Sequence, residues 1–409
     1  EDFDDLSLGY RTYLADIQNL IAKGNTLADS CFRLATSLQS NVAQLNSAFA
    51  GKRTPTVLNA AWQGNVLVFV GYAGKKIFTR RIGNKSAVVI DLDLLLRLVL
   101  LIHLVGLDND DNIVAPTLAG FLLLSIVVPR DEEFPCLYEL LISTSKCRTR
   151  LINDLFRIVG NFFLFHELGH IYTNQYGDDF LRAIFELPSG FDLLPANIRS
   201  VQLHPNGPIY NQIDFPGHQN GLLILSPLLE HWKKEFSSDI FAAYADVLTR
   251  AEKNPRAVDI EGFASDLTCW QMMLFAIGNR EQYIRAIAGG GTIADLSHPV
   301  AHARIDMLIY HLNFLAEEFA PEWQSRAMTL LKSQYDSLWA EDVLVLLQDS
   351  IEYVRYGFDE EGEHINVGKI ITFTGSPVPY TPSALSKLEQ FFLKPLLLKA
   401  NRIGWDAAT

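Results

Sequence analysis

Two histidines four residues apart, with a glutamate directly after the first, form the most chemically specific pattern in this chain. The segment from His166 to His170 has the sequence His-Glu-Leu-Gly-His and follows a run with helical periodicity. On a helix, side chains four residues apart lie on the same face, about one turn apart. Two imidazoles placed in this way can bind one zinc ion, and Glu167 is then positioned to take a proton from a water molecule.

A surface helix that matches this pattern by chance is the alternative interpretation. With ten histidines in 409 residues, such a match should occur on the order of once in a hundred chains. The neighbouring residues argue against chance, because Phe162, Phe163 and Phe165 predict a helix that enters an apolar core. Gly169 inside the motif would allow another backbone to approach closely.

A zinc site of this kind needs a third protein ligand, and three known arrangements can be tested. A third histidine six residues after His170 is absent, because residue 176 is a tyrosine, and no downstream Gly-Thr-x-x-Asp follows. The remaining arrangement is a glutamate on a later helix with an acid four residues on, as in Glu235-Phe-Ser-Ser-Asp239. Glu235 could bind zinc, and Asp239 could accept a hydrogen bond from a ligand histidine.

Other interpretations of these acidic residues stay open. Two solvated acids on a surface helix would be the simpler explanation if Glu235 and Asp239 stood alone. Glu230 and Asp246 are weaker candidates for the third ligand, since neither begins a Glu-x-x-x-Asp pattern.

Three blocks in this chain resemble the motif series of the gluzincin metallopeptidases, and most closely the group of HtpX and the CAAX prenyl proteases. The blocks are His-Glu-Leu-Gly-His, Glu-Phe-Ser-Ser-Asp-Ile-Phe-Ala-Ala-Tyr and Ser-His-Pro-Val-Ala-His-Ala-Arg-Ile, in the family order within residues 150–310. A more distant resemblance is to the Lit-type phage-exclusion peptidases. The membrane helices of HtpX and the prenyl proteases are missing, and the segment 177–227 is a long, proline-rich insertion.

The resemblance implies a role for each matching residue. His166, His170 and Glu235 would be the zinc ligands, Glu167 the general base, and Asp239 a partner of a ligand histidine. His298 and Arg304 would stabilise the oxyanion or hold the structure around it. The implied activity is that of a soluble zinc-dependent endopeptidase acting on a protein or peptide substrate.

His298 and Arg304 also have a physical case of their own. An imidazole N–H or a cation aimed at a developing oxyanion stabilises the transition state. The alternative is a helix start, since Pro299 suits the first turn of a helix. His302 lies four residues after His298 and could replace it, whereas His231, one turn before Glu235, is better explained as a residue at the edge of the site.

The elements that position these residues predict an α+β fold, with a mainly helical zincin-like core and a small antiparallel sheet. Helical periodicity covers 149–175 and 228–250, and further helices are expected at 263–287, 299–319 and 321–356. β-rich runs occur at 66–70, 76–79 and 87–90. Four regions follow along the chain. They are an N-terminal helical hairpin (1–60), a β-rich segment with apolar helices (61–148), a catalytic core with the insertion (149–320), and a C-terminal helical region (321–409).

Composition excludes some classes of function. The net charge of −13 argues against general nucleic-acid binding. Four cysteines without a Cys-x-x-Cys pair exclude a cysteine zinc site and a disulfide framework, and no signal-peptide pattern opens the sequence. We therefore expect a cytoplasmic protein. The longest uncharged stretch, 113–128, is shorter than the roughly 20 apolar residues of a membrane helix, so no membrane span is expected.

Two other hypotheses about function remain at this point, and the oligomeric state is open. The chain could be a regulatory or binding protein with a zincin core that is latent or inactive because the 177–227 insertion covers its cleft. It could also be a helical scaffold with a chance motif, which predicts no stoichiometric zinc. A site with four protein ligands would favour a structural metal, whereas an open fourth position would favour an enzyme.

Overall fold

The computed structural model describes the chain in separate stretches, and the site residues lie within them. The continuous stretches are 4–24, 26–51, 66–71, 77–82, 85–105, 149–176, 197–214 and 222–253, followed by shorter pieces between 266 and 311, then 356–358 and 364–366. These residues form mostly helices with small sheets, which agrees with the predicted α+β class.

Two long helices carry the core, and both were predicted from their periodicity. Helix α7 spans Thr149–Tyr176 and helix α9 spans Ser226–Lys253. They pack against each other more extensively than any other two described elements. Aromatic side chains of both helices are buried, and the rings of Tyr172 on α7 and Phe241 on α9 lie 5.5 Å apart between centroids. Because the chemically interesting residues lie on these same two helices, the packing of α7 on α9 positions the site.

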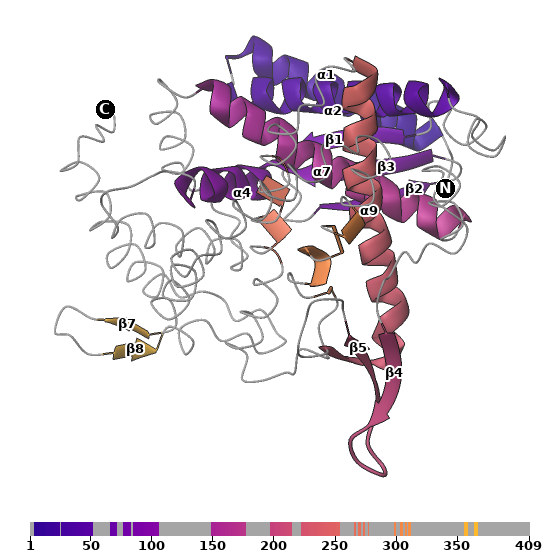
Figure 1. The fold of residues 1–409 in the computed structure, drawn as a ribbon. Helices are drawn as coiled ribbons and strands as arrows, with labels where there is room; N and C mark the ends of the chain where they lie inside the picture. Colours follow the sequence, from indigo (N-terminus) through magenta and orange to yellow (C-terminus); the bar gives the residue numbers. More distant parts are fainter. Residues whose placement is uncertain are drawn as a thin grey trace, which may run out of the picture.

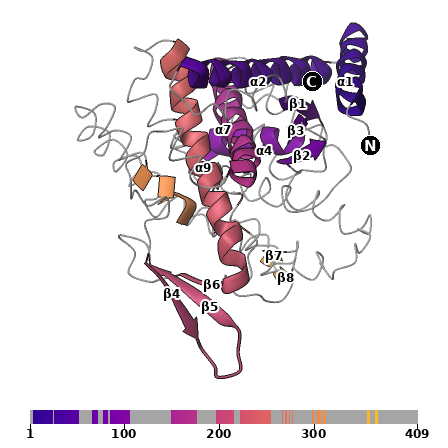
Figure 2. The ribbon, with the colours of Figure 1, turned by 90° about the vertical axis from the view of Figure 1, so that its right-hand side faces the viewer.

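Helix α2 lies across one end of this pair, and α1 packs on α2 (Figures 1 and 2). Helix α1 spans Asp4–Ala22 and helix α2 spans Thr26–Gly51. Between them Gly24 has a φ of 82°, a left-handed conformation that glycine adopts without steric cost. Apolar residues spaced three or four apart on α2 are buried, as at Leu38 and Leu45.

The first sheet contains the three predicted strands but is mixed, which corrects the expected antiparallel arrangement. Strands β1 (Val66–Gly71), β2 (Ile77–Ile82) and β3 (Lys85–Asp91) have the spatial order β1-β3-β2. Strand β2 pairs antiparallel with β3, whereas β1 pairs parallel with β3. Successive strands still alternate in direction, but β3 lies between the other two, so β1 meets a strand that runs the same way.

Side chains of the N-terminal helices cover the outer edge of β1. The amide of Gln39 donates to the Val66 carbonyl at 3.0 Å and accepts from the Val68 N–H at 2.9 Å. The Tyr13 hydroxyl donates to the Val70 carbonyl at 2.6 Å and accepts from the Val70 N–H at 2.9 Å. Such bonds satisfy backbone groups that an edge strand would otherwise expose.

The insertion 177–227 contains a second sheet, whereas the sequence predicted an irregular segment. Strands β4 (Asn197–Gln202), β5 (Ile209–Asp214) and β6 (Leu222–Leu225) form an antiparallel meander. Pro205 and Pro208 lie between β4 and β5, where proline does not interrupt strand pairing. The β4–β5 hairpin projects away from the helices at the start of α9 (Figures 1 and 2).

Apolar helix α4 spans Leu92–Val105 and follows β3 directly. The Asp91 carboxylate accepts a hydrogen bond from the Leu94 N–H at 2.7 Å, as an N-cap does. Leu95 and Leu98 are fully buried, so α4 is part of the core.

None of the helices in the described parts combines the length and the apolar character that crossing a bilayer requires.

After residue 253 the structure describes only single residues and short pieces of the chain. Helical residues occur within the predicted helices 263–287 and 299–319. In the predicted C-terminal helical region, the described residues are two short paired strands, β7 (Tyr356–Phe358) and β8 (His364–Asn366). The predicted helix 321–356 otherwise lies outside the described residues, as does the apolar stretch 113–128.

Candidate metal centre

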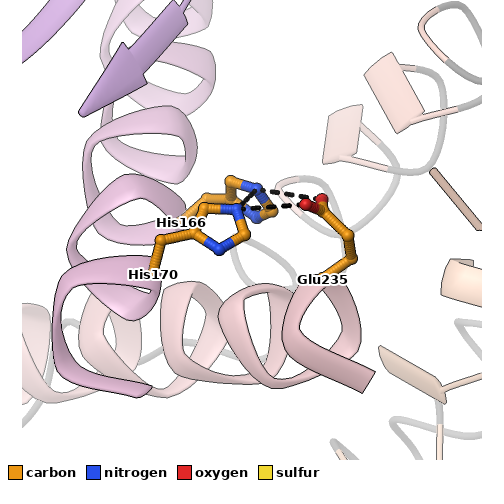
Figure 3. A group of neighbouring side chains, drawn as sticks. All are labelled: His166, His170 and Glu235. Atoms are coloured by element: carbon orange, nitrogen blue, oxygen red, sulfur yellow. Dashed lines mark hydrogen bonds and ion pairs between the residues drawn. The ribbon is translucent and has the colours of Figure 1, made fainter. Parts of the chain in front are cut away.

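Helix α7 supplies the two histidines of the predicted motif, and both imidazoles turn toward helix α9 (Figure 3). The Nε2 atoms of His166 and His170 lie 3.1 Å apart. Their side chains are mostly buried, with 9% and 18% of their surface exposed. The predicted convergence of two imidazoles four residues apart on a helix is thus present, at the centre of the α7–α9 contact.

Helix α9 supplies the third group, the carboxylate of Glu235 (Figure 3). Its Oε2 lies 3.5 Å from His166 Nε2, and its Oε1 lies 3.3 Å from His170 Nε2. The carboxylate is 3% exposed, and Oε2 makes no hydrogen bond to the part of the chain that the structure describes. The three ligand atoms predicted from the sequence therefore come together in one buried place.

The spacing of these three atoms can be compared with what a zinc ion requires. Zinc–nitrogen and zinc–oxygen bonds of about 2.0–2.2 Å in a tetrahedral centre place neighbouring ligand atoms about 3.3–3.6 Å apart. The two Nε2 atoms lie 3.1 Å apart, and each lies 3.3–3.5 Å from its nearest oxygen of Glu235, Oε1 for His170 and Oε2 for His166. The donor set of two imidazoles and one carboxylate thus fits a tetrahedral metal ion with little movement.

Each ligand histidine is oriented by a residue behind it. His166 donates from Nδ1 to the Asp239 carboxylate at 2.8 Å, so the neutral ring that binds a metal ion would keep its lone pair on Nε2, which faces the site. His170 Nδ1 lies 3.0 Å from Ser238 Oγ. If the ring donates its Nδ1 proton to that hydroxyl, the lone pair of His170 is on Nε2 and faces the site. Both partners stand beside each other on α9.

Arg304 holds Asp239 from the other side. Its Nε donates to Asp239 Oδ2, and one terminal nitrogen donates to Oδ1, each at 2.6 Å. Both side chains are buried, at 5% and 0% exposure. Two roles were predicted for Arg304, and this paired geometry favours the role of holding the structure around the site over contact with an oxyanion.

Gly169 lets the two helices approach closely at the level of the ligands. A Cβ atom on this residue would lie 2.7 Å from the Cα of Ser238 and 3.1 Å from its Cβ. Real side chains do not tolerate such a contact with backbone, so only glycine fits here. The close backbone approach predicted from the sequence is confirmed, and it brings Ser238 and Glu235 within reach of the α7 histidines.

Burial and charge shift the pKa values of the three candidate ligands in different directions. Burial alone would lower the pKa of His166, but the carboxylates of Asp239 and Glu235 outweigh it and raise that pKa to about 9. Burial opposes ionisation of Glu235, yet the neighbouring His166 holds the Glu235 pKa well below its usual range. Burial and the charge of His166 lower the pKa of His170 to about 4. Without a cation, the site is an ion pair beside a neutral imidazole.

Glu167 is buried next to the same group. Burial raises the pKa of its carboxyl to about 7, with the Glu235 charge acting in the same direction and His166 acting against it. His298 and Arg304 also act on this carboxyl through their charges. A carboxyl with a pKa near neutrality can exchange protons easily at physiological pH. A divalent cation bound by the three candidate ligands would lower the pKa of Glu167.

His298 and His231 border the site on its more exposed side. The Nε2 atoms of His298 and His231 lie 3.9 and 3.8 Å from Glu235 Oε1. The structure therefore brings His298 to the site, as predicted, and places His231 at its edge. His302, the alternative to His298, lies outside the described residues. Glu230, a weaker candidate for the third ligand, is exposed and pairs with Lys233 instead.

Ser238 is the one orienting residue that the sequence interpretation missed. It follows Glu235 by three residues and precedes Asp239, so it shares their helical face. A search for hydrogen-bond partners of both histidines, instead of one, would have found it. Asp246, the other weaker ligand candidate, instead accepts a hydrogen bond from Asn161 Nδ2 at 3.3 Å.

Comparison with known proteins gives no match for this chain, whether the comparison is with family models, with curated proteins or with solved structures. The observations that bear on function are therefore those of the site itself. They are three converging ligand atoms, a buried carboxyl beside them, and a hydrogen-bonded shell behind them.

Proposed function

We propose that this chain is a zinc-dependent endopeptidase with a zincin-like core, of the gluzincin type that its motifs resemble. The observation that carries the proposal is the convergence of His166, His170 and the Glu235 carboxylate, whose nitrogen and oxygen atoms lie 3.1–3.5 Å apart, close to the edges of a tetrahedral zinc site. Three protein ligands, with no fourth among the described residues of this group, are typical of catalytic zinc and not of structural zinc.

The chemistry divides between the metal and the buried carboxyl of Glu167. A zinc ion held by His166, His170 and Glu235 would supply Lewis acidity, polarising a peptide carbonyl and lowering the pKa of a water molecule. Glu167 accepts the proton of the attacking water and then delivers it to the leaving amine. Burial raises the pKa of this carboxyl above its usual range, which favours uptake of a proton from water.

Two further residues support the reaction in different ways. The imidazole of His298, near Glu235 and 41% exposed, can donate a hydrogen bond to the developing oxyanion of the scissile carbonyl. Arg304 is a positioning residue, because it acts on His166 through Asp239. The charged fork of Arg304 keeps Asp239 ionised, and the Asp239 carboxylate keeps the proton of His166 on Nδ1.

Strand β2 is the best candidate for binding an extended substrate. It lies against α7, and it pairs on one side with β3. On its other side no strand of the described residues pairs with it, whereas side chains of the N-terminal helices cover β1 at the opposite edge. A peptide added to β2 would gain main-chain hydrogen bonds regardless of its sequence. We expect a protein or peptide substrate, and a site of action in the cytoplasm.

Substitution of the general base separates zinc binding from catalysis. Glu167→Gln keeps the size of the side chain and removes its ability to accept a proton. We expect this variant to keep its zinc and its unfolding temperature while cleavage of a denatured protein substrate falls by at least about 100-fold. Glu230→Gln, at an exposed position of α9, is the matched control and should cleave like the wild type. Wild-type rates in Glu167→Gln would rule out the general-base role.

A further inference from the structure

A second group of potential metal ligands lies on the exposed side of Glu235. His231 of α9 and His298 both direct Nε2 toward Glu235 Oε1, at 3.8 and 3.9 Å. The two rings lie edge to face, with centroids 5.8 Å apart. The two nitrogens and the carboxylate oxygen all lie within 4.8 Å of one another. The proposed function uses only one of these two imidazoles and leaves His231 without a role.

The carboxylate of Glu235 faces both groups of histidines. Its Oε2 lies 3.5 Å from His166 Nε2, while its Oε1 lies 3.3 Å from His170 Nε2 and is also the oxygen nearest to His231 and His298. A carboxylate can bridge two metal ions about 3.5–4 Å apart, as in two-metal hydrolytic sites. The carboxylate is therefore able to serve the buried site and the exposed pair of histidines together.

We propose that His231, His298 and Glu235 form a second, weaker site for a late divalent transition metal ion such as Zn²⁺, with Glu235 as the shared ligand. Two imidazoles and a carboxylate form a donor set that suits zinc, copper and nickel more than magnesium or calcium. This second site depends on the proposed function only because Glu235 is also a ligand of the proposed catalytic site.

The second site is weaker for geometric reasons. Its separations of 3.8 and 3.9 Å exceed the edge of about 3.3–3.6 Å that a tetrahedral ion needs, so its side chains must move inward on binding. Its two histidine side chains are 46% and 41% exposed, so they lose more freedom on binding than the buried pair. No hydrogen bond comparable to that between His166 and Asp239 is described for His231.

Occupation of the second site has a functional consequence. A metal ion there uses the Nε2 of His298, the atom that would otherwise donate to the oxyanion. It also stands on the exposed side of Glu235, where a substrate would enter. Zinc in excess of one equivalent is therefore expected to inhibit the enzyme, and removal of the excess is expected to restore it.

Zinc stoichiometry measured by equilibrium dialysis against increasing free Zn²⁺ tests this proposal directly on the full chain. The wild type should bind one equivalent tightly and a second one at higher free zinc. His231→Ala should keep the tight equivalent and need at least about tenfold more zinc to bind the second. His204→Ala, an exposed histidine in the β4–β5 turn, is the matched control and should bind like the wild type.

The double variant His166→Ala/His170→Ala separates this proposal from the proposed function. It should lose the tight equivalent and still bind one zinc ion weakly, because His231, His298 and Glu235 remain. If the wild type takes up only one equivalent at every zinc concentration, the second site is refuted while the catalytic site stands. If His231→Ala binds a second equivalent as readily as His204→Ala does, His231 is not a ligand. If the double variant keeps tight zinc, the proposed catalytic site is refuted instead.

Discussion

At the scale of single residues, a series of hydrogen bonds connects Arg304 through Asp239 to His166, one of the candidate metal ligands. Arg304 makes two hydrogen bonds to Asp239, and Asp239 accepts one from His166. Every link is buried and charge-assisted, so each is stronger than a neutral hydrogen bond at the surface. The position of the His166 ring is thus set by residues that would not touch the substrate.

Replacement of Asp239 by Asn tests this chain of contacts. Asp239→Asn removes the charge that holds His166, and it leaves the buried Arg304 beside a neutral amide. We expect zinc affinity to fall about 10- to 100-fold, the usual effect of losing a partner behind a metal ligand. Titration with a competing chelator measures it, and Asp16→Asn, at an exposed position of α1, is the control. Equal affinities in the two variants would contradict an orienting role for Asp239.

Sequence alone identified most of this site, because spacing on a helix fixes which side chains share a face. His166, His170, Glu235 and Asp239 were found in this way. The pairing of Arg304 with Asp239 was less predictable. The resemblance named Arg304, but it left open whether this residue stabilises an oxyanion or holds the structure around the site. The hydrogen bond from His170 to Ser238 depends on how closely two helices approach, and periodicity does not report that distance.

At the scale of elements, the spacing between α7 and α9 decides whether the ligands meet. Their contact is closest at Gly169, where the Ser238 backbone occupies the space that a side chain would need. The histidines and Glu235 come from different helices, so even a small separation of the two helices would lengthen both histidine–glutamate distances. A single glycine therefore couples helix packing to the geometry of the site.

Two glycines of α7 provide a matched pair of substitutions. In Gly169→Ala the new methyl group would lie 2.7 Å from Ser238 Cα, so we expect a loss of about 1–3 kcal/mol in the free energy of unfolding, together with weaker zinc binding. In Gly160→Ala the nearest atom is a Leu38 side-chain carbon at 3.6 Å, an ordinary contact. That variant should be neutral or gain up to about 1 kcal/mol from helix propensity.

Denaturant unfolding and zinc titration of both variants check this prediction. The expected result is a lower midpoint and weaker zinc binding in Gly169→Ala only. Unfolding midpoints that agree for Gly169→Ala and Gly160→Ala would show that the close approach of α7 and α9 does not control stability.

The elements themselves were predictable to different degrees. Helices α7 and α9 are long and strongly periodic, so their patterns predicted them well. The order of the first sheet was not predictable, because the placement of β3 between β1 and β2 depends on the helices that cover β1. The second sheet was missed because its strands are short and the prolines around them dominate the composition of the insertion.

At the scale of the whole molecule, a buried polar contact joins three helices from distant parts of the chain. Asn41 of α2 donates to Asn161 Oδ1 at 2.6 Å, and Asn161 of α7 donates to Asp246 of α9 at 3.3 Å. Asn161 lies on α7 five residues before His166. The N-terminal hairpin is therefore fixed to the same pair of helices that carries the site.

Removal of the central residue of this contact should weaken the whole assembly. Asn161→Ala takes away one hydrogen-bond partner from Asn41 and one from Asp246, both buried. We expect a loss of about 1–3 kcal/mol in the free energy of unfolding for each group that loses its partner. Asn19→Ala, an exposed position of α1, is the control. Unfolding followed by circular dichroism and by tryptophan fluorescence measures the loss, and a stability equal to that of Asn19→Ala would contradict it.

Zinc content under limiting metal is the measurement that tests the central claim most directly. The claim is that two histidines of α7 and one glutamate of α9 form a zinc site. Wild-type protein purified with limiting zinc should contain one tightly bound equivalent, and so should Glu230→Ala, changed at an exposed glutamate of the same helix. Glu235→Ala should lose that equivalent while it stays folded. Tight zinc at the wild-type level in Glu235→Ala, or no zinc in the wild type, would contradict the claim.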